Sequence, residues 1–305
     1  ASLLIGIVNG LLVAVPATLL ELRARRIGWM RALRRLPFLV YLLAKTAILT
    51  LLIVLAVLAA RVAAALVSTT AQENFTERLG IVIAFSFGAT LIMLTVFEIG
   101  ALLGFTTLRD VFTGRYVRPR EERRLFVLLD LTGSTGLAER LGAPRFHALL
   151  ADFFRDISDA ALDGRGHIHK YVGDEAILTW EWSRGIADGN ALGVPFAARA
   201  RIADRADHYR RIYGVVPELR AAIHGGVVVA GEIGDVRREI AYVGDPLNVA
   251  ARLLDAARTV EGGVIVSREV LDAAPVPAGL AAIAMPALEL RGRAAPLAVA
   301  ALVPR

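Results

Sequence analysis

Cysteine is absent from this chain of 305 residues, and its absence excludes both a disulfide framework and a metal site built on thiolates. Internal repeats and low-complexity tracts are absent as well, so the chain is not a repeat array. Apolar residues are abundant: 56% of the chain is hydrophobic and the mean hydropathy is +0.56, above the level of an ordinary globular protein. This excess lies almost entirely in the first third of the chain, and it therefore indicates membrane segments rather than an unusually large core.

Acidic residues are outnumbered by basic ones, 29 to 35, which gives a net charge of +6 and a pI of about 10.1. Such a balance is compatible with a nucleic-acid partner. The arginines, however, gather beside the apolar runs, between residues 23 and 35 and between residues 109 and 124. This placement is typical of the flanks of membrane spans, so we expect a lipid bilayer as partner and no nucleic acid.

Three apolar stretches are long enough for a bilayer-spanning helix, which needs about 20 residues. They cover about residues 3–20, 37–66 and 79–105. The connection between the first two is rich in arginine, whereas the next, STTAQENFTER, is nearly charge-balanced; the positive-inside rule therefore predicts a multi-pass protein of the cell membrane with a cytoplasmic C-terminal part. Three spans then leave the start of the chain outside, so we expect a further span before Ala1. The alternative, buried helices of a soluble protein, is disfavoured by the length of the stretches and by basic flanks on one side only.

Two charged residues interrupt the second and third spans at matching depths. Lys45 and Glu98 each lie about 12 Å from the cytoplasmic end of their span, at a rise of about 1.5 Å per residue. Because an unpaired charge is expensive at that depth, we expect an ion pair between the two helices, within one protomer or between two. In the alternative, Lys45 extends to the lipid headgroups and Glu98 is protonated or meets water.

The remainder of the chain has the texture of a separate domain. Residues 107–123 are charged and predict a connector helix. From residue 124 to residue 305, short β-branched runs alternate with amphipathic segments in the order β-α-β-β-α-β-β-α-β. This pattern predicts one α+β domain with a mostly antiparallel sheet and helices on one face.

Two aspartates stand where folding alone gives little reason for an acid. Asp130 ends an otherwise apolar strand, and Asp174 follows Gly173 at the tip of an expected hairpin. Converging carboxylates commonly bind Mg²⁺ together with substrate phosphates, and the glycines and hydroxyls after Asp130 offer backbone N–H groups to an anion at a helix start. Taken singly, Asp130 is better explained as a helix N-cap and Asp174 as a turn residue.

Four segments change this balance because they occur together and in order: FVLLDLTGSTGLAERLG, IHKYVGDEAI, IHGGVVVAGEIG and VGDPLNVAARL. They resemble the class III adenylyl/guanylyl cyclase family in its membrane-anchored bacterial form, over about residues 123–303. The resemblance implies an α+β, ferredoxin-like cyclase domain over residues 124–305. Together with the apolar stretches, it predicts an α-helical transmembrane bundle followed by this domain. It also implies that this domain works as a homodimer.

The resemblance assigns roles position by position. It implies that Asp130 and Asp174, with the Leu131 carbonyl, bind two Mg²⁺ or Mn²⁺ ions per active site. Asn248 matches the residue that orients the ribose, and Arg252 matches the one that stabilises the pentavalent phosphorus. Three groups of residues match substrate-binding positions. Gly133, Ser134 and Thr135 match the phosphate-contacting turn, and Lys170 matches the purine contact. Arg291 stands where many cyclases have a phosphate-binding lysine. In the family, the metal ligands and the Asn/Arg pair of one site come from different protomers, so a monomer would be inactive.

The choice of purine is the least defined part of this assignment. In adenylyl cyclases a lysine, matched here by Lys170, donates to adenine N1, whereas guanylyl cyclases typically have a glutamate there. The second adenine contact of the family is an aspartate or threonine, and its place is taken by Ala241, which weakens the selection of ATP. His167 and His169 flank Lys170, and we interpret them as strand residues rather than metal ligands.

The sequence therefore predicts a membrane-bound adenylate cyclase that converts ATP to 3′,5′-cyclic AMP and pyrophosphate for intracellular signalling, by two-metal catalysis at a homodimer interface. Two alternatives stay open. One is a guanylate or dual-purine cyclase, which Ala241 permits. The other is a degenerate cyclase-fold relay without activity, against which the presence of both aspartates, Asn248 and Arg252 argues.

Overall fold

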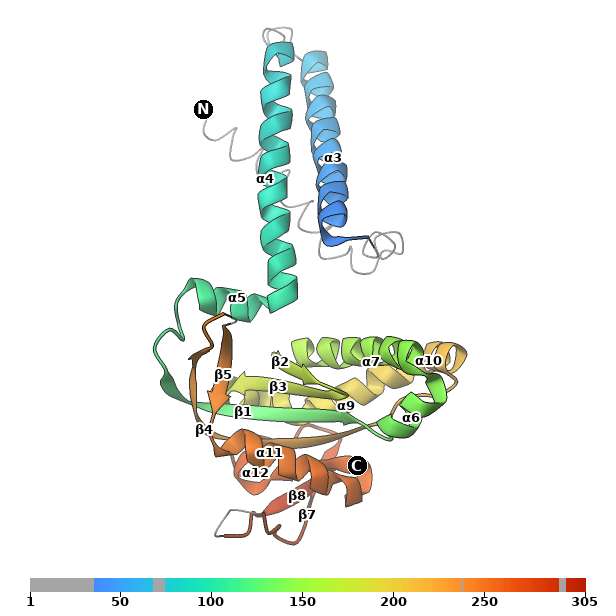
Figure 1. Ribbon diagram of the computed structural model, residues 1–305, viewed down its shortest axis with the longest axis vertical. Helices are drawn as coiled ribbons and strands as arrows, with labels where there is room; N and C mark the ends of the chain where they lie inside the picture. The colour runs from blue at the N-terminus through green and yellow to red at the C-terminus, as the bar shows by residue number, and fades with distance from the viewer. Residues whose placement is uncertain (1–35, 68–74, 237, 291–294) are drawn as a thin grey trace. The chain divides into compact units, whose positions relative to one another are not determined.

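The computed structural model describes residues 36–67, 75–236, 238–290 and 295–305 (Figure 1). Contacts divide the chain into two compact units, Ala1–Leu108 and Arg109–Arg305. The first predicted span, residues 3–20, lies outside the described residues.

Two long helices make up the described part of the N-terminal unit: α3 (Phe38–Val67) and α4 (Phe75–Leu103). Both expose large apolar side chains, among them Leu39 of α3 at 63% and Phe85 of α4 at 76%. One stretch in each helix is long and apolar enough to cross a membrane, by length and composition alone. The predicted spans 37–66 and 79–105 thus coincide with helices of the expected length.

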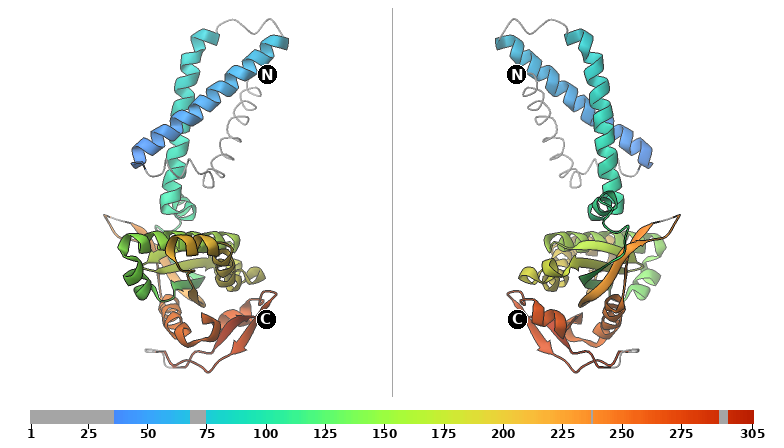
Figure 2. Two further views of the ribbon diagram at one scale, coloured as in Figure 1. Left: turned by 90° about the vertical axis from the view of Figure 1, so that its right-hand side faces the viewer. Right: turned by 90° about the vertical axis from the view of Figure 1, so that its left-hand side faces the viewer.

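A polar cluster joins α3 to α4, which cross each other in Figure 2. Lys45 Nζ lies 2.7 Å from Glu98 Oε1, and the Tyr41 hydroxyl donates to the same oxygen at 2.9 Å. Lys45 also donates to the Tyr41 hydroxyl at 3.1 Å. The Lys45 and Glu98 side chains are 3% and 13% exposed, so the predicted ion pair is confirmed and lies between the helices.

The C-terminal unit is built on a sheet whose described strands follow the order β2-β3-β1-β4-β6-β8-β7, with β5 paired to β4. Among the described residues, every pairing of strands is antiparallel except the parallel pair β4–β6. The strands are β1 (Arg120–Leu131), β2 (His167–Val172), β3 (Glu175–Glu181), β4 (Leu219–Ile233), β5 (Glu239–Val243), β6 (Val264–Ser267), β7 (Leu280–Ala284) and β8 (Val299–Pro304). The helices are α6 (Ser134–Leu141), α7 (Ala143–Asp163), α8 (Trp182–Ile186), α9 (Asn190–Asp204), α10 (Ala206–Tyr213), α11 (Asp245–Ala256) and α12 (Arg268–Ala273). The predicted alternation is confirmed from β1 to β6, and α12, β7 and β8 extend it.

Helices cover both faces of this sheet (Figure 1). Leu125 and Val127 of β1 point to one face, where α7 and α9 pack. The alternating residues Phe126 and Leu128 point to the opposite face, where they form a core with Leu253 of α11. Alternate residues of a strand face opposite sides, so these contacts define two cores. The expectation that helices lie on one face was therefore wrong; we call the side of Phe126 and Leu128 the α11 face.

The segment that leads into β1 is only partly helical. Helix α5 (Phe105–Phe112) is followed by turns, and β1 begins at residue 120. The expected connector helix over residues 107–123 was thus wrong beyond the end of α5. Gly114 takes a left-handed φ of 62°, and Pro119 lacks an N–H and disfavours a helical conformation in the residue before it.

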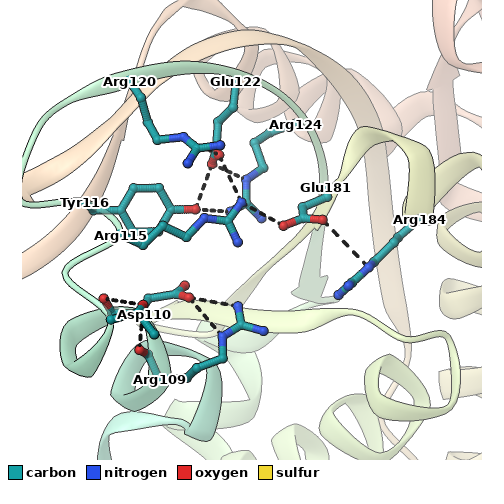
Figure 3. A network of polar contacts seen from close by, with 10 residues as sticks. Arg109, Asp110, Arg115, Tyr116, Arg120, Glu122, Arg124, Glu181 and Arg184 are labelled. Carbon is teal, nitrogen blue, oxygen red and sulfur yellow. Dashed lines mark hydrogen bonds and ion pairs between the residues drawn. The ribbon is translucent and has the colours of Figure 1, made fainter.

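A buried polar network fixes the start of β1 to that segment (Figure 3). The Tyr116 hydroxyl donates to Glu122 at 3.0 Å and accepts from Arg124 at 2.7 Å, and Arg124 Nε donates to Glu122 at 2.7 Å. Arg115 reaches Glu181, the last residue of β3, at 2.8 Å. Because Arg124 is 4% exposed, its charge requires these partners.

Candidate active site

Asp130 lies one residue before the end of β1, between the two strands that flank it. In the sheet register it stands opposite Glu175 of β3 and opposite Arg220 of β4. Its side chain shares the α11 face with Phe126 and Leu128, and the residue is 7% exposed. The Arg220 guanidinium forms an ion pair with the Asp130 carboxylate.

Asp174 belongs to the two-residue connection between β2 and β3. Gly173 before it adopts a φ of 62°, and this left-handed conformation is one that glycine takes without strain. The backbone N–H of Leu131 donates to the Asp174 carbonyl at 3.4 Å, which holds the hairpin tip against the end of β1. The structure therefore brings Asp130, Leu131 and Asp174 together, and their role as metal ligands stays a prediction.

The charges at this edge of the sheet are unbalanced toward the negative. Burial and the neighbouring Asp174 carboxylate raise the pKa of Asp130 to about 6, against the opposing effect of Arg220. Burial, followed by Asp130, Asp174 and Asp255, raises the pKa of Glu175 to about 7. Carboxylates that resist ionisation in this way favour the arrival of a cation.

The donors at this edge are of the kind that hard divalent cations prefer. Carboxylate and carbonyl oxygens suit Mg²⁺ and Mn²⁺. Within the described residues no group of three or more His, Cys, Asp or Glu is arranged to hold a metal, so the candidate donor set is Asp130, Asp174 and the Leu131 carbonyl. Mg²⁺ usually keeps several waters and takes further oxygens from substrate phosphates, so a set of this size fits it.

A turn that can receive an anion follows β1 directly. Gly133 has a φ of 69°, with open space where a Cβ would stand, and α6 begins at Ser134. The N–H groups in the first turn of a helix have no partner within that helix, and here Ser134 and Thr135 carry two of them. On the other side of Asp130, Arg220 Nε is buried and has no hydrogen-bond partner in the described part of the chain. The chain therefore offers donors on both elements next to Asp130, the start of α6 and β4.

Asn248 and Arg252 lie one turn apart on α11 and share its outer side. Asn248 is exposed and Arg252 half-buried, whereas Val249, Leu253 and their neighbours are buried against the sheet. Asp255, on the next turn of α11, is among the groups that raise the pKa of Glu175. Helix α11 thus carries both residues on the sheet face that bears Asp130, but no hydrogen bond or ion pair between described residues joins them to the carboxylates.

Lys170 lies on β2 opposite Ile177, which belongs to the core on the α11 face. Its ammonium pairs with Glu239 at the start of β5. Ala241, the departure from the family pattern, is half-buried in the same strand. His169 packs edge-on against Tyr242 at 4.9 Å between ring centroids, and burial, with Lys170 second, lowers its pKa to about 4, in keeping with its interpretation as a strand residue.

Arg291 falls within residues 291–294, outside the described residues, so its assignment stays a prediction. Three residues at the site were missed by the sequence reasoning: Glu175, Arg220 and Glu239. The signal available for Arg220 was a charge inside the apolar run ELRAAI. Its partner becomes visible only through the register of β1 and β4.

Solved structures of other proteins resemble the C-terminal unit. The adenylyl cyclase CyaB from P. aeruginosa matches with a TM-score of 0.55 at 21% identity, over 62% of this chain and 97% of that one. The guanylyl cyclase Cya2 matches with a TM-score of 0.53 at 18% identity, over 60% and 92%. The C-terminal unit therefore has the class III cyclase fold.

Sequence comparison leads to the same family. Adenylate cyclase 2 of Rhizobium meliloti (strain 1021) is 39% identical over 207 residues, which are 68% of this chain and 57% of that protein. An uncharacterized protein of Mycobacterium tuberculosis is 32% identical over 181 residues, 53% of this chain and 30% of that protein. No family model matches the chain. The chain spans little more than half the length of the rhizobial relative. On these similarities, it belongs to the class III adenylyl/guanylyl cyclase family.

Proposed function

We propose that this chain is a membrane-bound adenylate cyclase that forms 3′,5′-cyclic AMP and pyrophosphate from ATP. One observation carries the proposal: Asp130 and Asp174 lie close together at one edge of a cyclase fold, on the sheet face that also bears α11. The relative with 39% identity is named an adenylate cyclase, which agrees with this reading.

The proposed reaction follows from the placement of these groups. The ribose 3′-hydroxyl loses its proton to water and its oxygen forms a bond to the α-phosphorus, while the bond from that phosphorus to the bridging oxygen breaks and pyrophosphate leaves. Divalent cations held by Asp130, Asp174 and the Leu131 carbonyl would lower the pKa of the 3′-hydroxyl and neutralise the triphosphate. Arg252 stabilises the charge that develops on the phosphoryl oxygens, and Asn248 orients the ribose.

Two sets of donors support phosphate binding. The N–H groups at the start of α6 suit an anion, and the buried Nε of Arg220 offers a further donor. Arg220 pairs with Asp130, and cations bound by Asp130 would leave the Arg220 guanidinium to donate to a phosphate oxygen.

We further propose a homodimer in which each site uses both chains. Apolar side chains on the β4–β5 hairpin and on β2 are exposed among the described residues: Tyr171, Val172, Val227, Val229, Ile233 and Val243. Val229 and Val243 stand opposite each other in the pairing of β4 with β5, so part of this patch is continuous. A second copy of the chain would cover it and bring its own α11 toward the carboxylates.

The placement in the membrane is part of the same proposal. Lengths and composition of α3 and α4 suit two spans, and the arginines that flank the apolar stretches favour a cytoplasmic C-terminal unit. We propose residues 1–106 as a transmembrane domain and residues 124–305 as the catalytic domain.

One assay tests the activity and separates it from the alternatives. The detergent-solubilised chain is incubated with ATP or GTP and Mn²⁺, and both cyclic nucleotides are quantified. We expect cyclic AMP to exceed cyclic GMP. More cyclic GMP would favour the guanylate or dual-purine reading that Ala241 permits, and no product from either substrate would favour a degenerate relay.

A further inference from the structure

An ion pair connects two strands that do not pair with each other. Lys170 Nζ on β2 lies 3.4 Å from Glu239 Oε1 and 3.5 Å from Oε2 on β5. The strands meet because Tyr242 of β5 packs on Phe126 of β1, at 5.7 Å between ring centroids, and on His169 of β2. Strand β5 therefore crosses the α11 face, the face that bears Asp130.

Stability alone gives a weak reason for this pair. The two side chains are 49% and 42% exposed, and exposed ion pairs contribute about 0–1 kcal/mol. Lys170 is also one of two lysines among 35 basic residues, so the chain uses arginine almost everywhere else that it needs a cation. A compact ammonium at this position, where arginine would offer a broad fork, indicates recognition of a single acceptor atom.

Glu239 lies where it can make the second adenine contact, which Ala241 cannot make. Side chains two residues apart point to the same side of a strand, about 7 Å apart. Glu239 and Ala241 are related in this way, and they share their side of β5 with Val243, whose side chain is exposed. The longer side chain of Glu239 can extend its carboxylate toward the position that a polar residue in place of Ala241 would reach.

We propose that Glu239 is a purine-specificity residue: its carboxylate accepts a hydrogen bond from the 6-amino group of adenine while Lys170 donates to N1. The inference rests on the proposed cyclase activity and on the purine role of Lys170. One donor beside one acceptor matches the adenine edge, which offers N1 as acceptor and the 6-amino group as donor. Guanine reverses both, because O6 would face the carboxylate and N1–H would face the ammonium.

The test compares three triphosphates that differ at the purine edge. These are ATP, purine riboside 5′-triphosphate, which lacks the 6-amino group, and GTP. For the natural chain we expect kcat/KM to favour ATP over purine riboside triphosphate by about tenfold or more, since a site built around a hydrogen bond rejects an analogue that lacks it. Glu239→Gln should bring this ratio toward one and raise the share of GTP, because a carboxamide can donate to O6.

The control is Asp235→Asn, which removes an exposed carboxylate from the same β4–β5 hairpin and should leave both ratios unchanged. An unchanged ratio of ATP to purine riboside triphosphate in Glu239→Gln, even with lower overall turnover, would overturn the proposal and leave Glu239 as a partner that only positions Lys170.

Failure of the cyclase activity is recognised separately. If no triphosphate turns over, the proposed function fails, and base selection is read from binding of the non-cyclising analogues 3′-deoxy-ATP and 3′-deoxy-GTP with Mn²⁺. Preference for 3′-deoxy-ATP that Glu239→Gln abolishes supports the base contact without the reaction. Equal binding of both analogues to the natural chain overturns it.

Discussion

Asp130 is ionised at a cost to the folded state, because burial and Asp174 raise its pKa to about 6. A carboxyl whose pKa is raised by folding makes its ionised form less stable in the fold than in the unfolded chain. Asp130→Asn should therefore keep or slightly raise the melting temperature at pH 7. The same change removes a proposed metal ligand, so we expect cyclic nucleotide formation to fall by about 10²–10³-fold. Turnover and thermal unfolding are measured on the same preparation.

The matched control for this change is Asp272→Asn, which removes an exposed carboxylate that pairs with Arg268 on α12. It should alter neither quantity. Normal turnover in Asp130→Asn would exclude the metal assignment, and a large fall in melting temperature would show that Asp130 serves the fold.

The residues of the site differ in how far the sequence alone could reveal them. Asp130 and Asp174 were predictable because each interrupts a local pattern, an apolar strand and a glycine turn. Arg220 and Glu239 were not predictable, because the sequence around a charged residue in a strand does not identify its partner. Their roles depend on contacts with residues 69 and 90 positions away along the chain, and the tertiary fold decides which strand residues meet.

Among the elements, α3 and α4 are joined by Lys45 and Glu98, whose side chains are nearly inaccessible. Removing one partner leaves a buried charge, at a cost of about 3–5 kcal/mol, whereas replacing both with apolar residues is close to neutral. Lys45→Leu and Glu98→Leu should each lower the melting temperature in detergent, and the double variant should recover most of the loss. If the double variant equals the sum of the two single changes, the helices are not coupled through this pair.

A second prediction concerns the contact of α7 with α10. Burial alone would raise the pKa of Asp152, but hydrogen bonds with His208, Tyr213 and Arg205 outweigh it and lower that pKa below its ordinary value of 3.8. The two closest are 2.8 Å long. A depressed pKa stabilises the fold above the unfolded value, and this contribution is lost as the pH falls through the folded one.

The measurement is thermal unfolding of the natural chain and of Asp152→Asn from neutral pH into acid. The variant should be less stable at pH 7, and the gap should close below about pH 4. A gap of constant size across this range would show that the contact of α7 with α10 does not depend on the charge of Asp152.

At the scale of elements, their order was readable from the sequence but their placement was not. Alternating and helical periodicities predicted the succession from β1 to β6. Amphipathicity shows that α11 has a buried side, yet it does not tell which face of the sheet receives it, and the single-face expectation failed there. The connector helix is shorter than expected for a local reason. Gly114 adopts a left-handed φ of 62° two residues after the end of α5, and Pro119 directly precedes the first residue of β1.

We expect the whole molecule to work as a pair of chains. Valines of the β4–β5 hairpin are exposed, and in the described part of the chain no hydrogen bond or ion pair joins Asn248 or Arg252 to the carboxylates. A symmetric dimer would contain two sites, each built from the aspartates of one chain and α11 of the other. Every chain then contributes half of each site. The two halves can be damaged separately.

Mixing Asp130→Asn chains with Arg252→Ala chains should therefore restore activity that neither variant has alone. If protomers exchange freely, half of the dimers are mixed and each has one intact site, which gives about a quarter of the natural activity. The control mixes the natural chain with a chain that carries both substitutions: with shared sites every mixed dimer is inactive, and activity also falls to about a quarter, whereas sites contained within one chain would leave about half. Exchange is verified by co-purification through two different tags. No recovery in the first mixture, with mixed dimers present, and half activity in the second would together show that each chain holds a complete site.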